Sequence, residues 1–396
     1  MPSMQLASNI SFDDTSIAFE AKSTKQLKKA NFLFSVVNNP FMSDLSTGAV
    51  KVGMALGLPI KGIIKHTIFE HFCGGETIDK SKETIKELAD YGIGTILDYS
   101  VEGEDDEASF DKTRDEIIKT ILVAKDSPNI PFSVFKVTGL ASADLLMKIQ
   151  HGEVLTPGEE QAFDRVKERV NDICWTAYES GVPILVDAEE TWLQEPIDTM
   201  VYDMMKAYNQ ERCIVYNTLQ MYRTETLEAL KKALHFCTMH NIHLGVKLVR
   251  GAYMEKERER AEEKGYPSPI QPTKEATDEN FNQALGYCID NIQRISFVCG
   301  SHNEYSNYYL ALLMEKYNIK NDDSRIWFAQ LYGMSDNISF NLAKAGYNVA
   351  KYVPYGPVKS VIPYLLRRAS ENTSVAGQSS RELSLIRKEL KRRKSV

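Results

Sequence analysis

Eight short runs of apolar and β-branched residues each finish in polar side chains that could bind or act on a ligand. These side chains belong to Asp98, Lys136, Asp187, Gln220, Lys247, Arg250, Tyr253, Ser301, His302, Gln330 and Tyr352. A charged residue that ends a strand is often only the first solvated position, so one such residue alone indicates little. Eight runs that end in the same way favour a shared functional edge.

The cationic residues among them indicate what kind of ligand would bind. An arginine pair in the C-terminal segment YLLRRASEN joins them, which gives the set Lys136, Lys247, Arg250, Arg367 and Arg368. Cations that converge repel one another unless an anion binds, and the planar guanidinium suits a carboxylate or a pyrophosphate. Glu371, one turn after the arginine pair, would support it on the same helix. The alternative for the pair is a solvated helix face, which is what most charge runs are.

The pattern of apolar and polar residues predicts the secondary-structure elements that position these residues. The eight runs occupy residues 92–100, 131–137, 182–189, 213–222, 243–253, 295–303, 325–334 and 348–356. Their first halves show almost no polar alternation, as expected of parallel strands buried on both faces, and amphipathic stretches separate them. Eight such units predict an α/β fold, a (β/α)8 TIM-like barrel. A doubly wound sheet is the alternative, but the sequence has no GxGxxG turn.

The domain organisation is predicted from the point along the chain where the repeated strand pattern begins. Residues 1–85 read as helical pieces without a repeated strand signal and are expected to form an N-terminal helical arm. The barrel is expected over residues 86–372, with a C-terminal helix over its mouth, and residues 373–396 form a basic C-terminal tail.

Two near-matches to known motifs do not predict function. GLPIKGII has Ile63 where a phosphate-binding loop needs lysine. HTIFEHF has one residue too many between His66 and Glu70 for a zinc motif, and a packing helix is the better interpretation. We therefore predict no metal site. A metal-dependent barrel hydrolase would need histidine pairs at strand ends, and only His302 is suitably placed.

The composition limits the class of protein. A net charge of -7 over 396 residues argues against nucleic-acid binding, which needs a dominant positive surface. Six cysteines without a CxxC pair indicate a reduced interior. The first residues are too acidic for a typical transit peptide, and no stretch of about 18 uncharged apolar residues could span a membrane. We expect a cytoplasmic location, at most peripheral on the inner face of the membrane.

Three long segments resemble signature blocks of the proline dehydrogenase family. They are KLVRGAYMEKERERAEEKGYPSPI (247–270), QLYGMSD (330–336) and YVPYGPVKSVIPYLLRRASEN (352–372). VDAEET (186–191) and the FKVTGLA segment (135–141) match further strand ends of the family. The likeness covers residues 92–372 and implies a distorted (β/α)8 barrel that holds FAD at the strand C-termini, in agreement with the strand count.

The resemblance also implies roles for individual residues. Those matching the family's substrate site are Lys136, Asp187, Tyr253, Leu331, Tyr352, Arg367, Arg368 and Glu371. Those among its flavin contacts are Gln220, Lys247, Arg250, Gly251, Ala252, Ser301, His302 and Gln330. Relatives can have Arg at the position of Lys247 and Lys at that of Arg250, so this chain departs from them at these two cofactor contacts.

The implied function is FAD-dependent oxidation of L-proline to Δ1-pyrroline-5-carboxylate, the first step of proline catabolism. The implied partners are L-proline, a quinone electron acceptor and a separate pyrroline-5-carboxylate dehydrogenase, because the remaining chain has no room for one. Hydroxyproline dehydrogenase is the near alternative, and its smaller residue at the position of Tyr352 makes this tyrosine favour proline. A non-catalytic barrel that binds an anionic metabolite is the alternative from another class.

The basic tail RELSLIRKELKRRKSV predicts an amphipathic helix. Leu383, Ile386 and Leu390 recur at helical spacing, and the opposite face is rich in Lys and Arg. Such a helix could lie on an anionic membrane surface, or it could dock on the protein. Three apolar residues bury little area, which slightly favours a terminal helix docked on the barrel, whereas electron transfer to a membrane quinone favours contact with the membrane.

Overall fold

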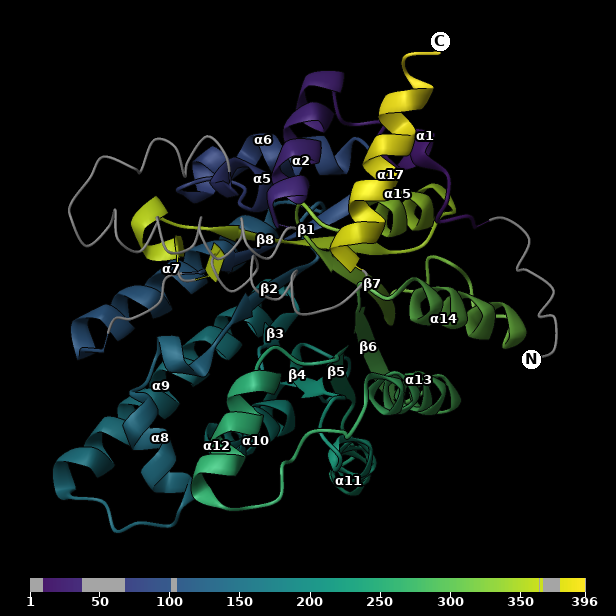
Figure 1. Ribbon diagram of the computed structural model, residues 1–396. Helices are drawn as coiled ribbons and strands as arrows, with labels where there is room; N and C mark the ends of the chain where they lie inside the picture. Colours follow the sequence, from purple (N-terminus) through teal and green to yellow (C-terminus); the bar gives the residue numbers. More distant parts are fainter. Residues whose placement is uncertain (1–9, 38–67, 101–104, 363, 366–377, 396) are drawn as a thin grey trace. The chain divides into compact units, whose positions relative to one another are not determined.

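The computed structural model describes residues 10–37, 68–100, 105–362, 364–365 and 378–395. The chain divides into two compact units. The first consists of residues 104–329 with residues 1–8, and the second of residues 9–103 with residues 330–396. Figure 1 follows the chain by colour from the N-terminal arm to the C-terminal helix.

Eight parallel strands form one closed barrel in the order β1-β2-β3-β4-β5-β6-β7-β8. Their bounds are β1 (Ile93–Tyr99), β2 (Phe132–Phe135), β3 (Ile184–Val186), β4 (Val215–Gln220), β5 (Leu244–Val249), β6 (Ile295–Gly300), β7 (Ile326–Leu331) and β8 (Val349–Tyr355). Each strand lies inside one of the eight predicted runs, so the predicted (β/α)8 barrel is confirmed. Every residue of β2, β4 and β8 is buried, as expected when helices cover a parallel sheet.

The first unit contributes the helices between β1 and β7. They are α7 (Glu107–Lys125), the 3-10 turn η2 (Val137–Gly139), α8 (Ala143–Gln150), α9 (Pro157–Ser180), α10 (Thr191–Tyr208), α11 (Thr226–Met239), α12 (Met254–Lys264), α13 (Lys274–Asp290) and α14 (Glu304–Lys316). Local sequence sets their ends. In α9, Thr156 and Glu159 form a reciprocal capping box, Pro157 follows the cap, and Gly181 ends the helix in the left-handed region at φ 67°.

The second unit joins the two ends of the chain around β1 and β8. Its helices are α1 (Thr15–Ala18), α2 (Thr24–Val37), α5 (Glu70–Phe72), α6 (Ile78–Ala89), α15 (Asp336–Lys344) and α17 (Gln378–Arg392). One apolar cluster joins α1, α2, α5, the segment after β8 and α17, and it includes Phe19, Phe34, Phe72, Val361 and Ile386. The predicted boundary at residue 85 falls inside α6. The predicted helix over the barrel mouth is described only at residues 358–362 and 364–365, and GLPIKGII lies outside the described residues.

The C-terminal tail forms the predicted helix, and its apolar face is covered. Leu383 and Ile386 are 8% and 1% exposed within the cluster shared with the N-terminal arm. Several of its basic side chains are also engaged: Arg381 pairs with Asp13 at 2.7 Å, and Arg393 donates to the carbonyl of Phe19 at 2.8 Å. The expectation that this apolar face could lie on a membrane is therefore wrong, because the N-terminal helices occupy it.

Candidate active site

The first unit places most of the predicted site residues at the C-terminal ends of its strands. Lys136 follows β2, Asp187 follows β3, and Gln220 is the last residue of β4. The remaining ones are Lys247 inside β5, Arg250, Gly251, Ala252 and Tyr253 after β5, and Ser301 and His302 after β6. Parallel strands present their carboxyl ends at one edge, so the predicted residues of this unit share that edge.

Lys247 and Asp187 form a buried ion pair between the ends of β5 and β3, the two strands that flank β4. The Lys247 ammonium donates to Oδ1 of Asp187, and the two side chains are 6% and 15% exposed. The backbone N–H of Asp187 in turn donates to the carbonyl of Phe135 at 2.9 Å. Because both charges are largely removed from water, loss of either partner would leave the other uncompensated. The pair therefore fixes the ends of β3 and β5 relative to each other.

Arg250 is held by four side chains. Its Nε donates to Asp278 at 2.7 Å, and its two terminal nitrogens donate to Ser301 at 2.7 Å and Ser306 at 2.9 Å. The guanidinium also lies over the ring of Phe281, 4.5 Å from its centre. Contacts through all three nitrogens fix the orientation of this planar group, as a binding group for an anion requires.

Asp278 balances two cations beside this arginine. Its second oxygen accepts from Lys274 at 2.8 Å. Partial burial raises the pKa of the Asp278 carboxyl, but Lys274 and Arg250 lower it by more, so the net pKa is below its usual value. Asp278 and Ser306 were not among the predicted site residues. The spacing of four residues between Lys274 and Asp278 on a helix is the signal that could have indicated the first of them.

The turn after β5 needs glycine at position 251. Gly251 has φ 133°, and a Cβ there would lie 2.1 Å from the ring of Tyr222. Tyr222 is fixed by its own N–H, which donates to the carbonyl of Arg250 at 2.7 Å. The N–H of Ala252 donates to Oε1 of Gln220 at 3.4 Å, and Tyr253 then precedes α12 as its N-cap. The close approach of the Gly251 backbone to the Tyr222 ring thus positions Ala252, a predicted cofactor contact, and Tyr253, a predicted substrate contact.

Glu189 is a buried acid at this edge that the sequence did not single out. One of its oxygens accepts from the N–H of Thr138 at 2.9 Å and the other from the hydroxyl of the same residue. Its carbonyl accepts from Gln220 at 2.8 Å. Burial raises the pKa of Glu189 to about 7, against the lowering by Thr138 and by the nearby Lys136 ammonium. Glu189 links the segment after β2 to the end of β4, between three predicted site residues.

The second unit places three predicted residues at the ends of β7 and β8. Gln330 and Leu331 are the last residues of β7, and Tyr352 lies within β8. The hydroxyl of Ser339 donates to Gln330 at 2.8 Å, and the N–H of Tyr332 donates to the carbonyl of Tyr352 at 2.8 Å. The other three predicted residues, Arg367, Arg368 and Glu371, lie outside the described residues.

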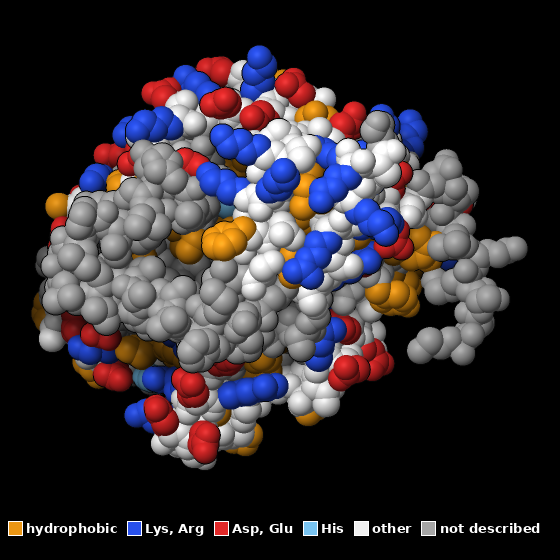
Figure 2. All heavy atoms as spheres, turned by 45° about the horizontal axis from the view of Figure 1, so that its top comes forward, with side chains coloured by type: hydrophobic (Ala, Val, Ile, Leu, Met, Phe, Trp, Pro, Cys, Tyr) orange, Lys and Arg blue, Asp and Glu red, His pale blue; other side chains and the backbone are white. Residues whose placement is uncertain are grey.

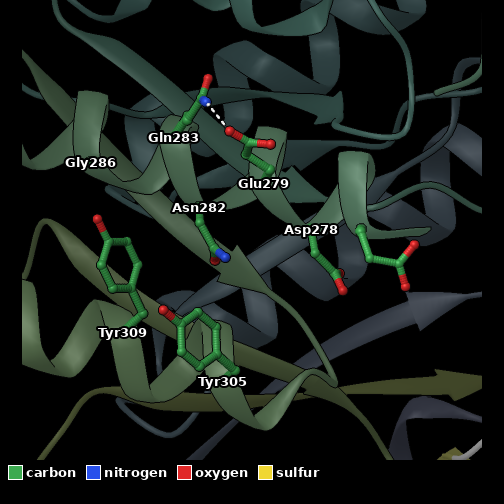
Figure 3. A pocket seen from close by; sticks show the side chains of 8 residues that line it. Asp278, Glu279, Asn282, Gln283, Gly286, Tyr305 and Tyr309 are labelled. Atoms are coloured by element: carbon green, nitrogen blue, oxygen red, sulfur yellow. Dashed lines mark hydrogen bonds between the residues drawn. The ribbon is translucent and has the colours of Figure 1, made fainter. Parts of the chain in front are cut away.

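A hollow of about 480 Å³ lies elsewhere in the first unit, between α13 and α14 (Figure 3). Glu275, Asp278, Glu279, Asn282 and Gln283 line it from α13, with Tyr305 and Tyr309 from α14. Asp278 connects it to the strand ends through Arg250, and Asn282 does so through Ser306. Among the described residues, no three His, Cys, Asp or Glu side chains gather in a way that could hold a metal ion.

The chemistry of the strand ends fits an anionic cofactor. Lys247 pairs with Asp187, while Arg250 and Lys274 share a single carboxylate, Asp278, so these ion pairs carry a net positive charge. The hydroxyl of Ser301 and the imidazole of His302 add hydrogen-bonding groups at the next strand end. A positive excess with orienting polar groups suits a pyrophosphate. A closed parallel barrel with this arrangement defines the class as a barrel enzyme.

Comparisons with known proteins identify which barrel enzymes the chain is similar to. The family described as "Proline dehydrogenase" matches residues 81–381. Proline dehydrogenase 1, mitochondrial, from Dictyostelium discoideum is 34% identical over 426 residues, 96% of this chain and 74% of that protein. Hydroxyproline dehydrogenase from Xenopus laevis is 31% identical over 421 residues, 97% of this chain and 90% of that protein.

A solved structure has the same fold. Proline utilization A from Bdellovibrio bacteriovorus, inactivated by N-propargylglycine, aligns with a TM-score of 0.71 at 21% identity. The alignment covers 92% of this chain and 38% of that one, so this chain spans about two fifths of the solved protein. The chain belongs to the proline dehydrogenase family. It is an oxidoreductase that acts on proline in proline catabolism, and its family is flavin-dependent in general.

Proposed function

We propose that this chain oxidises L-proline to Δ1-pyrroline-5-carboxylate with a tightly bound FAD. The observation that carries the proposal is the pair of oriented cations at the end of β5, Lys247 and Arg250, within the family block that begins at Lys247. Lys247 and Arg250 would hold the pyrophosphate, and Ser301, His302 and Gln330 would add hydrogen bonds. Gln220, Gly251 and Ala252 would approach the flavin through the turn after β5.

The substrate assignments rest on the family resemblance. The residues concerned are Lys136, Asp187 and Tyr253 of the first unit, Leu331 and Tyr352 of the second, and Arg367, Arg368 and Glu371 outside the described residues. The arginine pair and Lys136 would bind the proline carboxylate, since guanidinium and ammonium groups form charge-assisted hydrogen bonds to it. The two tyrosines and Leu331 would pack against the proline ring.

These residues would orient the substrate and set its protonation. When bound, the flavin accepts the hydride that leaves proline. The protein groups hold the carboxylate so that the ring carbon on the far side of nitrogen faces the cofactor. The amine must be unprotonated to release a hydride, and the cations around the carboxylate favour the neutral amine by repulsion between like charges.

4-Hydroxyproline is the alternative substrate, because a hydroxyproline dehydrogenase is 31% identical over nearly the whole chain. Tyr352 supports proline, since its ring would fill the space that a hydroxyl group on the substrate needs. Only 8% of Tyr352 is exposed, which supports a packing role.

We also propose a quinone as the electron acceptor and a separate dehydrogenase as the enzyme that consumes the product. No helix among the described residues is long and apolar enough to span a bilayer. Contact with an anionic membrane would use the basic face of α2 and α17, where Lys and Arg side chains gather (Figure 2). This face exposes Lys25, Lys28, Lys391 and Lys394, together with Phe32 at 69% exposure. The relative from Dictyostelium is named as mitochondrial, which does not match the predicted cytoplasmic location.

Charge reversal on that face tests the membrane contact. Lys25→Glu with Lys391→Glu should lower cosedimentation with anionic vesicles at low salt, because each basic residue near such a surface contributes about 1 kcal/mol. Lys167→Glu on α9 reverses an exposed charge of the first unit and serves as the control. Equal cosedimentation of the wild type, the double variant and the control would show that this face does not bind the membrane.

Steady-state kinetics with a soluble quinone tests the reaction itself. Flavin-replete protein should oxidise L-proline, with the pyrroline product trapped chemically, and kcat/KM for proline should exceed that for 4-hydroxyproline by roughly 10 to 200-fold. A preference for 4-hydroxyproline would favour the alternative substrate. Turnover of neither substrate would exclude both.

A further inference from the structure

The segment that follows β7 has an unusual backbone. Gly333 has φ 78°, and a Cβ there would lie 2.3 Å from the carbonyl oxygen of His71. Ser335 has φ 51°, the left-handed region that a residue with a side chain rarely adopts. Such conformations persist only where the surrounding structure fixes them. Residues Leu331–Asp336, which we call the β7 loop, must therefore be held by the rest of the second unit.

A buried lysine of β8 holds the β7 loop from one side. Lys351 is 0% exposed, and its ammonium donates to the carbonyls of Leu331 at 3.4 Å and of Met334, and to Oδ1 of Asp336 at 2.9 Å. Burial lowers the pKa of Lys351, and Asp336 only partly offsets this. All three bonds run to the β7 loop, so this lysine fixes the loop to the strand that carries Tyr352.

Both ends of the chain hold the β7 loop as well. From the N-terminal arm, Lys22 pairs with Oδ2 of Asp336 at 2.6 Å, and the ring of His71 contacts the carbonyl of Gly333 at 2.9 Å. From the C-terminal helix, Glu382 accepts from the N–H of Ser335 at 3.0 Å. In Figure 1, α17 runs beside α1 and α2, and α1 packs against α15, which brings these groups together.

Four ionisable groups surround the β7 loop. Two lysines, Lys22 and Lys351, pair with Asp336, and burial raises the pKa of the nearby Glu382 to about 7. Burial raises the pKa of Asp336, but the two lysines outweigh it and hold this pKa well below its usual value. Burial also lowers the pKa of His71 to about 3, so the imidazole is neutral. Removal of one charge would leave a buried partner uncompensated.

We propose that Asp336, Lys351, Lys22 and Glu382 are positioning residues for the oxidation of proline, which fix the end of β7 against β8. The proposal rests on the proposed substrate contacts of Leu331 and Tyr352. Lys351 precedes Tyr352 in β8 and binds the carbonyl of Leu331, and the N–H of Tyr332 binds the carbonyl of Tyr352 at 2.8 Å. A displaced β7 loop would move both side chains, and a shift of about 1 Å at a reacting site costs about 100-fold in rate.

It follows that the N-terminal arm and the C-terminal helix take part in catalysis through this loop. Lys22 and Glu382 are 360 residues apart in the sequence, yet they act on neighbouring positions, Asp336 and Ser335. A purely structural role would change the stability of the protein without changing the kinetics of its folded, flavin-loaded fraction. A positioning role changes those kinetics.

The test compares variants of the full flavin-loaded chain. Asp336→Asn should raise KM for proline on the order of 10 to 100-fold, measured on the flavin-loaded fraction of the protein. It should also speed amide exchange at Tyr332 and Ser335. Glu382→Leu removes the acceptor for the N–H of Ser335 and should act in the same direction, whereas Glu382→Gln keeps an acceptor and should stay within about threefold of the wild type.

Glu389→Gln is the matched control. Glu389 is also a fully buried acid of α17, but its partners are Arg392 and Arg393, both at 2.7 Å, rather than the β7 loop. It should lower thermal stability and leave KM unchanged. If Asp336→Asn does not fold, the two Glu382 variants decide the question alone. Wild-type KM values in all folded variants, with an active wild type, would overturn the proposal, and an inactive wild type would overturn the proposed function instead.

Discussion

Replacement of Glu189 by glutamine should change how the stability of the protein depends on pH. Glu189 is 3% exposed, and burial raises its pKa from 4.5 to about 7. A carboxyl with a raised folded-state pKa binds a proton more tightly in the folded than in the unfolded chain. Its contribution to stability is therefore fully present below pH 4.5 and is lost as the pH rises through about 7. The shift corresponds to about 3 kcal/mol over this window.

Glu189→Gln keeps an oxygen that can accept from the N–H of Thr138 but cannot ionise. The free energy of unfolding in urea, measured at pH 5, 6, 7 and 8, should fall less steeply with pH in the variant than in the wild type. The difference between the two proteins should change by about 3 kcal/mol from the acid to the neutral end, in favour of the variant. Burial and the charge of Asp336 also raise the pKa of Glu382 to about 7. Glu382 should therefore contribute equally to the pH dependence of the unfolding free energy in both proteins. Parallel curves would show that Glu189 does not titrate in this range.

Two further substitutions test the substrate assignments. Arg368→Met should raise KM for proline much more than it lowers flavin content, because a desolvated charge-assisted pair is worth roughly 2 to 5 kcal/mol; Arg367→Met should do the same, and unchanged proline kinetics in both would place the carboxylate elsewhere. Tyr352→Ser should reduce the discrimination against 4-hydroxyproline by a factor within the 10 to 200-fold range that pocket shape provides, and an unchanged ratio of the two kcat/KM values would exclude Tyr352 from the pocket.

The strands could be predicted because a parallel strand buried on both faces is an unbroken apolar run. The run at 131–137 contains β2, and the run at 348–356 contains β8. The ends of the predicted runs also gave Lys136, Asp187 and Arg250, since polar residues are most common where a strand leaves the core.

Contacts between distant segments could not be predicted in the same way. Lys351 interrupts the run of β8 as a charged residue, and nothing in the sequence indicates that it is fully buried against the β7 loop. In VDAEET, two adjacent acids look equivalent, yet Glu189 accepts from Thr138 while Glu190 pairs with Lys256 at 2.8 Å. The apolar spacing of α17 predicts a helix, but the partner of its apolar face depends on α1 and α2, more than 350 residues away.

The most direct test of the central claim is an anaerobic absorbance titration of the purified protein with L-proline. The protein should be yellow, with the bands of oxidised flavin, and these bands should bleach as proline is added. A colourless, folded protein that cannot be reconstituted with FAD would contradict the account, as would a bound flavin that proline does not reduce.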